Sequence, residues 1–111
     1  MLKVIVLLKR KPGLSWEEFD RYWEERHGPL AAKLVPGTRR YVQNHIVRQP
    51  GDPEPPYDGI AELWMDDMDA WKRLLEWSAG EEGRPVGEDE AKFLDRSQFV
   101  IFLCDEKVMK G

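Results

Sequence analysis

The alternation of apolar and polar positions predicts four strands along the chain. Residues 1–10, MLKVIVLLKR, form a nearly continuous apolar run rich in branched residues, which is typical of a central strand buried on both faces. Residues 38–48 and 57–65 alternate with a period of two, which indicates two further strands with one apolar face each. Residues 96–105 contain the run FVIFLC, which predicts a last strand.

The first long helix is predicted within LSWEEFDRYWEERHGPL, residues 14–30. Ser15 and Glu18 have the spacing of a capping box, in which the hydroxyl and the carboxylate each bind a free amide at the helix start. An apolar stripe then recurs with helical spacing and comprises Trp16, Phe19, Trp23 and Leu30. The Gly-Pro pair at residues 28–29 is expected to stop this helix, because proline disfavours the helical conformation of the preceding residue. A short second helical segment then covers residues 29–34.

Two more helices are predicted in the second half of the chain. Asp66 or Asp67 can cap a helix that ends near residues 79–80, since its apolar positions recur with helical spacing. Residues 81–87 are expected to form a polar loop, and residues 88–95 a short helix. Between the second and third strands, residues 49–56 carry four of the eight prolines and predict a stiff loop.

The resulting order is strand, helix, strand, strand, helix, strand, within one domain that covers residues 1–111. This order predicts a ferredoxin-like α+β fold, with a four-stranded antiparallel sheet and both long helices on one face. The alternation places several candidate residues together on the uncovered face: Tyr41, Gln43, His45, Ile60, Glu62 and Trp64. Asn44 has the opposite parity and is expected to face the helices. An aromatic sheet face of this kind needs cover, so a homodimer is expected.

Charge and composition limit the classes of partner. The net charge is −4, the isoelectric point is near 5.2, and charges of both signs are interspersed, which argues against nucleic acid or membrane partners. Cys104 is the single cysteine and has no partner for an intrachain disulfide. No segment resembles a signal peptide or a membrane span, so a cytoplasmic location is expected. Five Trp, four Phe and three Tyr residues have to enter a core, a ligand pocket or a subunit interface.

Two histidines are candidate catalytic bases. His45 has Tyr41 and Gln43 beside it on its strand, and an imidazole on a partly dry pocket wall can serve as a base at neutral pH. The alternative role of His45 is a hydrogen bond across a dimer interface. His27 stands at the predicted end of the first helix, where it is either a pocket residue or a cap for the last carbonyls.

Five further residues are candidates for substrate binding. Glu62 can act as a base or orient an imidazole if burial raises its pKa, and its alternative is an ion pair with a nearby arginine. Tyr41 and Trp64 offer flat walls for an aromatic or alicyclic ligand, although such side chains also serve plain packing. The amides of Gln43 and Asn44 complete the set. No ligand-spaced pair such as His-x-His, no haem ligand and no phosphate-binding loop is present, so neither a metal nor a cofactor is expected.

Four segments carry a family resemblance: KPGLSWEEFDRYWEERHGPLA, RYVQNHIV, YDGIAELW and DEAKFLDRSQFVIFLCDE. In this order and spacing they resemble the EthD family of dimeric α/β-barrel proteins. The resemblance implies a homodimer in which two sheets pack face to face into a barrel, with a pocket in each sheet–helix half. It also implies a wide range of chemistry, because the superfamily contains cofactor-free monooxygenases, polyketide cyclases, lactone isomerases, dehydratases and haem enzymes.

Two functions stay open on the sequence. The first is a cofactor-independent enzyme of the oxidoreductase (monooxygenase), cyclase, isomerase or dehydratase type, which acts on an aromatic or oxygenated metabolite by histidine-assisted proton transfer. The second is a non-catalytic ligand-binding or accessory protein of a degradation or biosynthesis pathway. A cavity of roughly 300 Å³ or more beside His45 would favour the enzyme.

Overall fold

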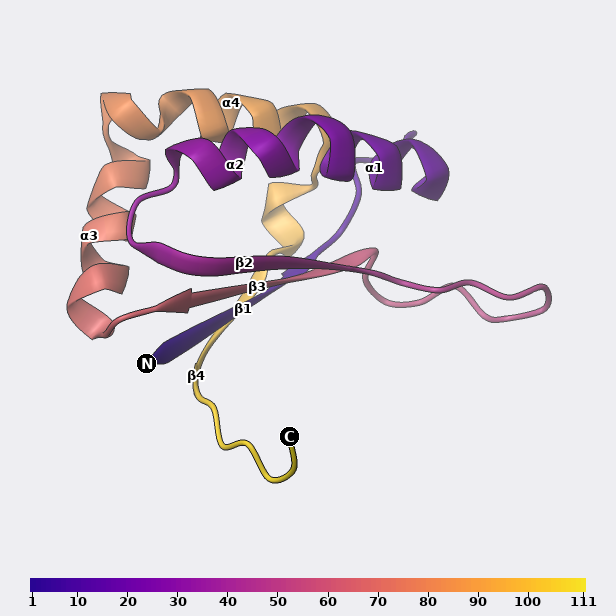
Figure 1. Cartoon of the computed structure of the whole chain (residues 1–111). Coiled ribbons are helices and arrows are strands. Elements are labelled where there is room, and N and C mark those ends of the chain that lie inside the picture. Colours follow the sequence, from indigo (N-terminus) through magenta and orange to yellow (C-terminus); the bar gives the residue numbers. More distant parts are fainter.

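A single sheet carries helices on one face only (Figure 1) in the computed structural model, which describes residues 1–111. The strands are β1 (Leu2–Leu8), β2 (Thr38–His45), β3 (Gly59–Met65) and β4 (Val100–Asp105). The helices are α1 (Trp16–Tyr22), α2 (Gly28–Leu34), α3 (Met68–Ala79) and α4 (Arg84–Phe93). Three short elements complete the chain: a π-helical turn η1 (Trp23–His27) and two 3₁₀ turns, η2 (Glu81–Gly83) and η3 (Arg96–Gln98).

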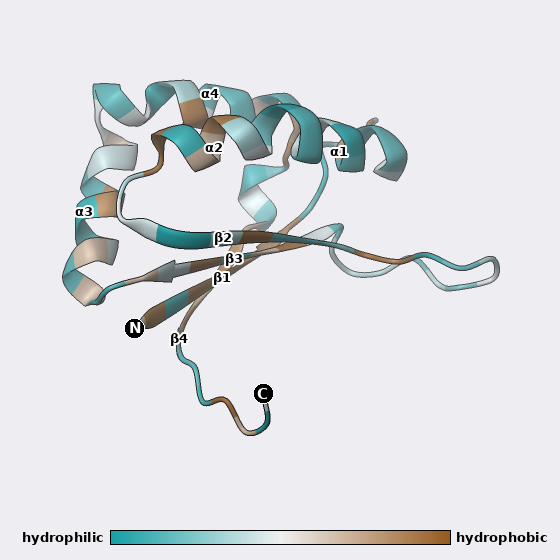
Figure 2. Cartoon of the chain, in the orientation of Figure 1, coloured by the Kyte–Doolittle hydropathy of each residue, from teal (hydrophilic) through white to brown (hydrophobic).

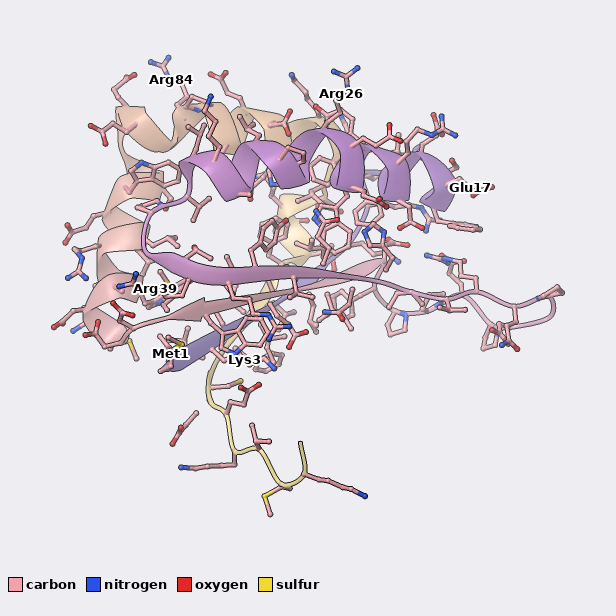
Figure 3. The ribbon with its side chains drawn as sticks, viewed as in Figure 1. Met1, Lys3, Glu17, Arg26, Arg39 and Arg84 are labelled. Atoms are coloured by element: carbon pink, nitrogen blue, oxygen red, sulfur yellow. The ribbon has the colours of Figure 1, made fainter.

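The four strands are all antiparallel and lie in the order β2-β3-β1-β4. This topology confirms the predicted ferredoxin-like α+β fold. Apolar residues concentrate in the strands, whereas the outer surface of the helices is mostly hydrophilic (Figure 2). Arg26 and Arg84 extend from that outer surface away from the sheet (Figure 3). The arrangement leaves one face of the sheet without helical cover.

The first helix begins as predicted but does not stop at the Gly-Pro pair. The capping box is confirmed, since the Glu18 amide donates to the Ser15 hydroxyl at 3.1 Å and the Ser15 amide donates to the Glu18 carboxylate at 3.0 Å. The expected break before Pro29 is wrong, because Gly28 keeps helical angles (φ −55°, ψ −53°) and its N–H bonds the Trp23 carbonyl five residues back. A proline removes one N–H and clashes with the carbonyl four residues before it, and one wider π turn accommodates both effects.

The main core lies between α1, α4 and the middle of the sheet. It comprises Leu8, Phe19, Trp23, Ala61, Phe93 and Leu94. Trp23 packs directly over the backbone of Gly59, where a Cβ atom would come within 2.6 Å of the indole. Gly59 therefore has to lack a side chain so that the helix layer can approach β3 this closely.

The register of β2 corrects the predicted faces of the sheet. Tyr41 pairs with Leu63 and Gln43 pairs with Ala61, and paired residues of antiparallel strands share a face. Tyr41, Gln43 and His45 therefore face the helices, and the expectation that they lie on the uncovered face is wrong. Glu62 and Trp64 lie on the uncovered face as expected, but Asn44 joins them there, opposite Ile60.

Helix α4 begins at Arg84, four residues before the predicted start, with Pro85 in its first turn. The expected polar loop over residues 81–87 is therefore wrong for its second half. Proline is well suited to the first turn of a helix, because its missing N–H would have no helical partner there. The earlier start brings Val86 and Asp89 onto the buried side of the helix.

A buried carboxylate ties the proline-rich loop to the end of β1. The side chain of Asp58 is fully buried and accepts hydrogen bonds from Arg10 at 2.5 Å and from Arg48 at 2.7 Å. The Arg10 backbone amide adds a third bond at 2.9 Å. Glu54 bridges the same two arginines from outside the fold, at 2.9 and 3.1 Å.

Candidate functional site

A cavity of about 540 Å³ lies between the helix layer and the sheet. Most of its wall is apolar, and the large wall residues include Trp23, Leu63, Trp71, Trp77, Phe99 and Ile101. The polar residues on the wall include His27 from η1, Tyr41 from β2, Glu90 from α4 and Arg96 from η3. A mainly apolar chamber of this size with a few polar groups is typical of a site for a small organic molecule.

His27 is held by a buried carboxylate of the neighbouring helix. Its Nδ1 atom lies 2.9 Å from Asp89 Oδ2, and the Tyr22 hydroxyl donates to Asp89 Oδ1 at 2.5 Å. Both His27 and Asp89 are buried, and the imidazole also packs against the ring of Phe93 at 4.9 Å. Because Asp89 accepts from Nδ1, the proton of the neutral imidazole resides there, and Nε2 carries the free lone pair.

Burial and hydrogen bonding set the charges of this group. Burial lowers the pKa of His27 despite the nearby Asp89. Burial acts to raise the pKa of Asp89, but hydrogen bonds from Tyr22 and His27 outweigh it and lower that pKa. Burial and the bond to Asp89 raise the pKa of Tyr22 to about 12. At neutral pH the arrangement therefore pairs a neutral imidazole with an ionised carboxylate and a protonated phenol.

Tyr41 is a hydrogen-bond donor without an acceptor in the chain. The Gln43 amide nitrogen donates to the Tyr41 hydroxyl at 3.1 Å and to the Trp23 carbonyl at 2.9 Å. No group of the protein accepts the Tyr41 proton, and burial raises the pKa of this phenol. Tyr41 therefore stays protonated on the cavity wall, with its proton available to a ligand oxygen.

His45 extends this hydrogen-bond chain on the side of Gln43 away from Tyr41. Its Nδ1 lies 3.1 Å from Asp20 Oδ1 and its Nε2 lies 2.9 Å from the Gln43 side-chain oxygen. Its ring packs on Trp23 with centroids 4.6 Å apart. Both ring nitrogens are therefore occupied within the protein, and the cavity meets His27 and Tyr41 whereas His45 stands behind Gln43.

The structure separates the remaining candidates from the cavity. Asn44 donates to Glu62 at 2.8 Å and to the Ile60 carbonyl at 2.9 Å on the uncovered face of the sheet. Lys3 lies on this face (Figure 3) and binds Glu62 at 2.5 Å. The hydrogen bond from Lys3 lowers the pKa of Glu62, so the expectation of a raised pKa is wrong.

Trp64 belongs to the same surface. Its indole N–H donates to Glu106 at 3.2 Å, and Lys3 and Arg40 lie over its ring at 4.8 and 4.7 Å. Asn44, Glu62 and Trp64 therefore form a polar cluster beneath the sheet rather than a wall of the chamber.

Asp89 and Glu90 are the two acidic residues at the site that the sequence interpretation missed. Both lie on α4, and the predicted start of that helix at residue 88 hid their relation to Val86. With the observed start, Val86, Glu90 and Leu94 are spaced four residues apart and line the cavity. A carboxylate in the middle of that apolar stripe is the signal that would have identified Glu90.

No cluster of three or more His, Cys, Asp or Glu residues is arranged to hold a metal ion. The helices of the chain are all too short or too polar to cross a bilayer.

Solved structures share this architecture over nearly the whole chain. An ethyl tert-butyl ether d (EthD) family protein from Bacillus halodurans is 26% identical, with a TM-score of 0.70, and the match covers 96% of this chain and 99% of that one. An EthD-like protein from Ralstonia eutropha is 17% identical, with a TM-score of 0.69 and coverage of 98% and 94%. A dimeric protein with a ferredoxin-like fold from Bacteroides fragilis is 17% identical, with a TM-score of 0.63 and coverage of 95% of both chains.

The two less similar structures support the fold alone. No functionally curated protein matches the sequence. The EthD domain model matches residues 11–97, a span that includes the capping box, the π turn, β2, β3 and the Asp89–Glu90 pair of α4. The chain therefore belongs to the EthD domain family.

Proposed function

We propose that the cavity binds a small aromatic or alicyclic ketone and that His27 removes a proton from the carbon next to the carbonyl, without a cofactor. One observation carries this proposal: a neutral imidazole, fixed at Nδ1 by Asp89, lines an apolar chamber of about 540 Å³. Nε2 makes no hydrogen bond with the protein, so its lone pair is free to accept a proton.

Tyr41 supplies the complementary group. As the carbon loses its proton, negative charge develops on the carbonyl oxygen, and a phenol on the cavity wall stabilises that charge through a hydrogen bond. The imidazolium formed at His27 is stabilised in turn by the ionised Asp89 at 2.9 Å. Base, donor and counter-charge thus come from three different elements, η1, β2 and α4.

Gln43 and His45 act as positioning residues in this scheme. Because Gln43 donates to the Tyr41 oxygen at 3.1 Å, the Tyr41 proton has to point elsewhere, and the cavity is the direction without a competing acceptor. His45 holds the opposite end of the Gln43 amide at 2.9 Å. This chain of contacts gives Gln43 and His45 a role without contact with the ligand.

The test uses 4-phenylbutan-2-one, a neutral aromatic ketone of suitable size, in deuterated buffer. Proton NMR follows exchange of the hydrogens next to the carbonyl. We expect the wild-type protein to catalyse this exchange and His27→Gln to lose about 100-fold in rate or more, the range expected for removal of a general base. A Tyr41→Phe variant should lose rate with little change in ketone affinity.

Two outcomes would contradict the proposal. Exchange at the wild-type rate in His27→Gln would exclude His27 as the base. Binding of the ketone without any exchange would instead favour a ligand-binding or accessory protein. Circular dichroism of each variant shows that the fold is retained.

We further propose that a second copy of the chain covers the uncovered face of the sheet. That face presents Ile5, Leu7, Val42 and Ile60 together with Phe102, which is 50% exposed. An apolar patch of this kind is usually covered by a partner, and the similar protein from Bacteroides fragilis is described as dimeric. Light scattering should therefore give twice the subunit mass of 13.0 kDa.

A further inference from the structure

Glu90 occupies a position where packing calls for an apolar side chain. It lies on α4 between Val86 and Leu94, which are 7% and 4% exposed, and all three line the cavity. Carboxylates rarely lie within such a stripe unless they are paired. The side chain therefore projects into the chamber that holds His27 and Tyr41.

No group of the protein pairs with this carboxyl. Its neighbour Asp89 is engaged by His27 and Tyr22, and Glu88 lies on the outside of the helix near Arg84 at 4.0 Å. Arg96, whose charge acts on Glu90, donates to the Gly87 carbonyl at 3.4 Å and makes no ion pair with Glu90. Glu90 is thus the free acidic group of the cavity wall.

The surroundings shift Glu90 toward its protonated form. Burial raises the pKa of this carboxyl, the charge of Asp89 raises it further, and the charge of Arg96 only partly opposes them. His27 shifts in the opposite direction, toward its neutral form. Two titratable groups in one cavity whose pKa values are shifted in opposite directions are suited to act as an acid and a base in the same reaction.

We propose that Glu90 is a second catalytic residue that delivers a proton to a departing hydroxyl, so that the cavity takes β-hydroxy ketones and eliminates water from them. This inference rests on the proposed role of His27 and narrows it to one class of reaction. It also assigns the substrate a polar group on each side of an apolar frame: a carbonyl toward Tyr41 and a hydroxyl toward Glu90.

The elimination balances within the site. His27 Nε2 takes the proton from the carbon next to the carbonyl, and the electron pair of that C–H bond forms the new C=C bond. The C–O bond at the next carbon breaks, and its oxygen leaves with the bonding pair and the Glu90 proton as water. The product is an α,β-unsaturated ketone, and the proton on His27 returns to Glu90 through solvent after product release. No oxidant or reductant is required.

The experiment compares two probes on the same protein. 4-Hydroxy-4-phenylbutan-2-one reports elimination through the ultraviolet absorbance of the conjugated product, and 4-phenylbutan-2-one, which lacks the hydroxyl, reports proton abstraction alone. We expect Glu90→Gln to lower the elimination rate by about 100-fold and to lower the ratio of elimination to exchange at least about tenfold. Glu90→Leu, which completes the apolar stripe and keeps the fold, should give the same loss.

Glu88→Gln is the matched control, since it makes the same change on the outside of the same helix and should leave both rates unchanged. The pH profile adds an independent readout: elimination should decline at alkaline pH as Glu90 ionises, and Glu90→Gln should lack that decline.

Elimination by Glu90→Gln within about threefold of wild type would overturn the inference, since loss of a general acid costs far more. An equal loss of elimination and exchange would also overturn it. A wild-type protein that exchanges the simple ketone but never eliminates water would refute the role of Glu90 alone, and one that does neither would refute the role of His27 as well.

Discussion

His27 couples the site to the stability of the fold through its charge. Its pKa in the folded protein lies below the ordinary value of 6.5, because burial disfavours the imidazolium. The unfolded chain therefore binds more protons than the folded chain once the pH falls below about 6.5. Protonation then favours unfolding.

We accordingly expect the free energy of unfolding to decrease as the pH is lowered from 7.5 toward 5. Urea titrations at a series of pH values measure this dependence, and His27→Gln should remove part of the slope just below pH 6.5. Asp89 acts at lower pH: its folded pKa is depressed, so its stabilising contribution is present above its ordinary range and is lost as acid protonates it. A steeper slope in His27→Gln than in wild type would contradict a buried neutral imidazole.

The candidate residues of β2 could be identified from the sequence, but the face of the sheet on which they lie could not. Tyr41, Gln43 and His45 alternate with Val42 and Asn44, and the rule that apolar residues face the core favours Val42 on the helix side. The rule fails here because apolar residues lie on both faces of the sheet, Ala61 and Leu63 toward the helices and Val42 and Ile60 on the uncovered face. The polar side chains instead line or support a cavity inside the helix side.

At the scale of elements, the π turn between α1 and α2 joins the fold to the site. The Trp23 carbonyl accepts both the Gly28 N–H and the Gln43 side-chain amide. A Cβ atom on Gly28 would lie 2.7 Å from the Gln43 nitrogen and 3.1 Å from that carbonyl. The sequence showed a glycine and a proline that disfavour a regular helix, but it did not show the wider turn, whose Trp23 carbonyl also accepts from Gln43 of a distant strand.

Two glycine substitutions should therefore have opposite effects. Gly87→Ala, in α4, should stabilise the protein by about 0.5–1 kcal/mol, because its Cβ has no atom closer than 4.0 Å and alanine favours the helix. Gly28→Ala should destabilise it by about 1 kcal/mol or more, since displacement of Gln43 loses two hydrogen bonds. Thermal and urea unfolding measure both changes, and stabilisation by Gly28→Ala would show that Gln43 does not hold this turn.

The loop between β2 and β3 depends on Asp58. Removal of this carboxylate in Asp58→Ala leaves Arg10 and Arg48 without their buried partner, which should cost about 3 kcal/mol. Glu54→Gln is the control, because Glu54 contacts the same arginines from a side chain that is 55% exposed and should cost less than about 1 kcal/mol. Urea unfolding distinguishes the two, and equal costs would contradict a specific role for the buried carboxylate.

At the scale of the whole molecule, the order of elements was enough to predict the ferredoxin-like sheet, since this order has one common packing solution. The cavity was not predictable in the same way. It requires Asp89 and Glu90 of α4 to meet His27 of η1 and Tyr41 of β2, and no local pattern links these segments. Only the packed helix layer brings them together.

Association of two copies has a direct test on the uncovered face. Phe102→Glu places a charge within the apolar patch, on the edge strand β4 and opposite Ile5 of β1. We expect the variant to shift the mass measured by light scattering from that of the dimer toward the subunit mass of 13.0 kDa. Lys72→Glu, an exposed change on α3, is the control and should leave the mass unchanged. A wild-type protein that is monomeric at micromolar concentration would refute the proposed assembly.

The path of the last residues affects how the protein should be prepared. After β4 the chain continues beneath the sheet, on the side away from the helices (Figure 1), and Glu106 is bound there by Lys3 at 2.8 Å. An affinity tag or fusion partner joined after Gly111 would hang over the surface where a second copy is expected to dock. Such an extension would compete with docking, so oligomeric state and activity should be measured on protein tagged at another position or with the tag cleaved off.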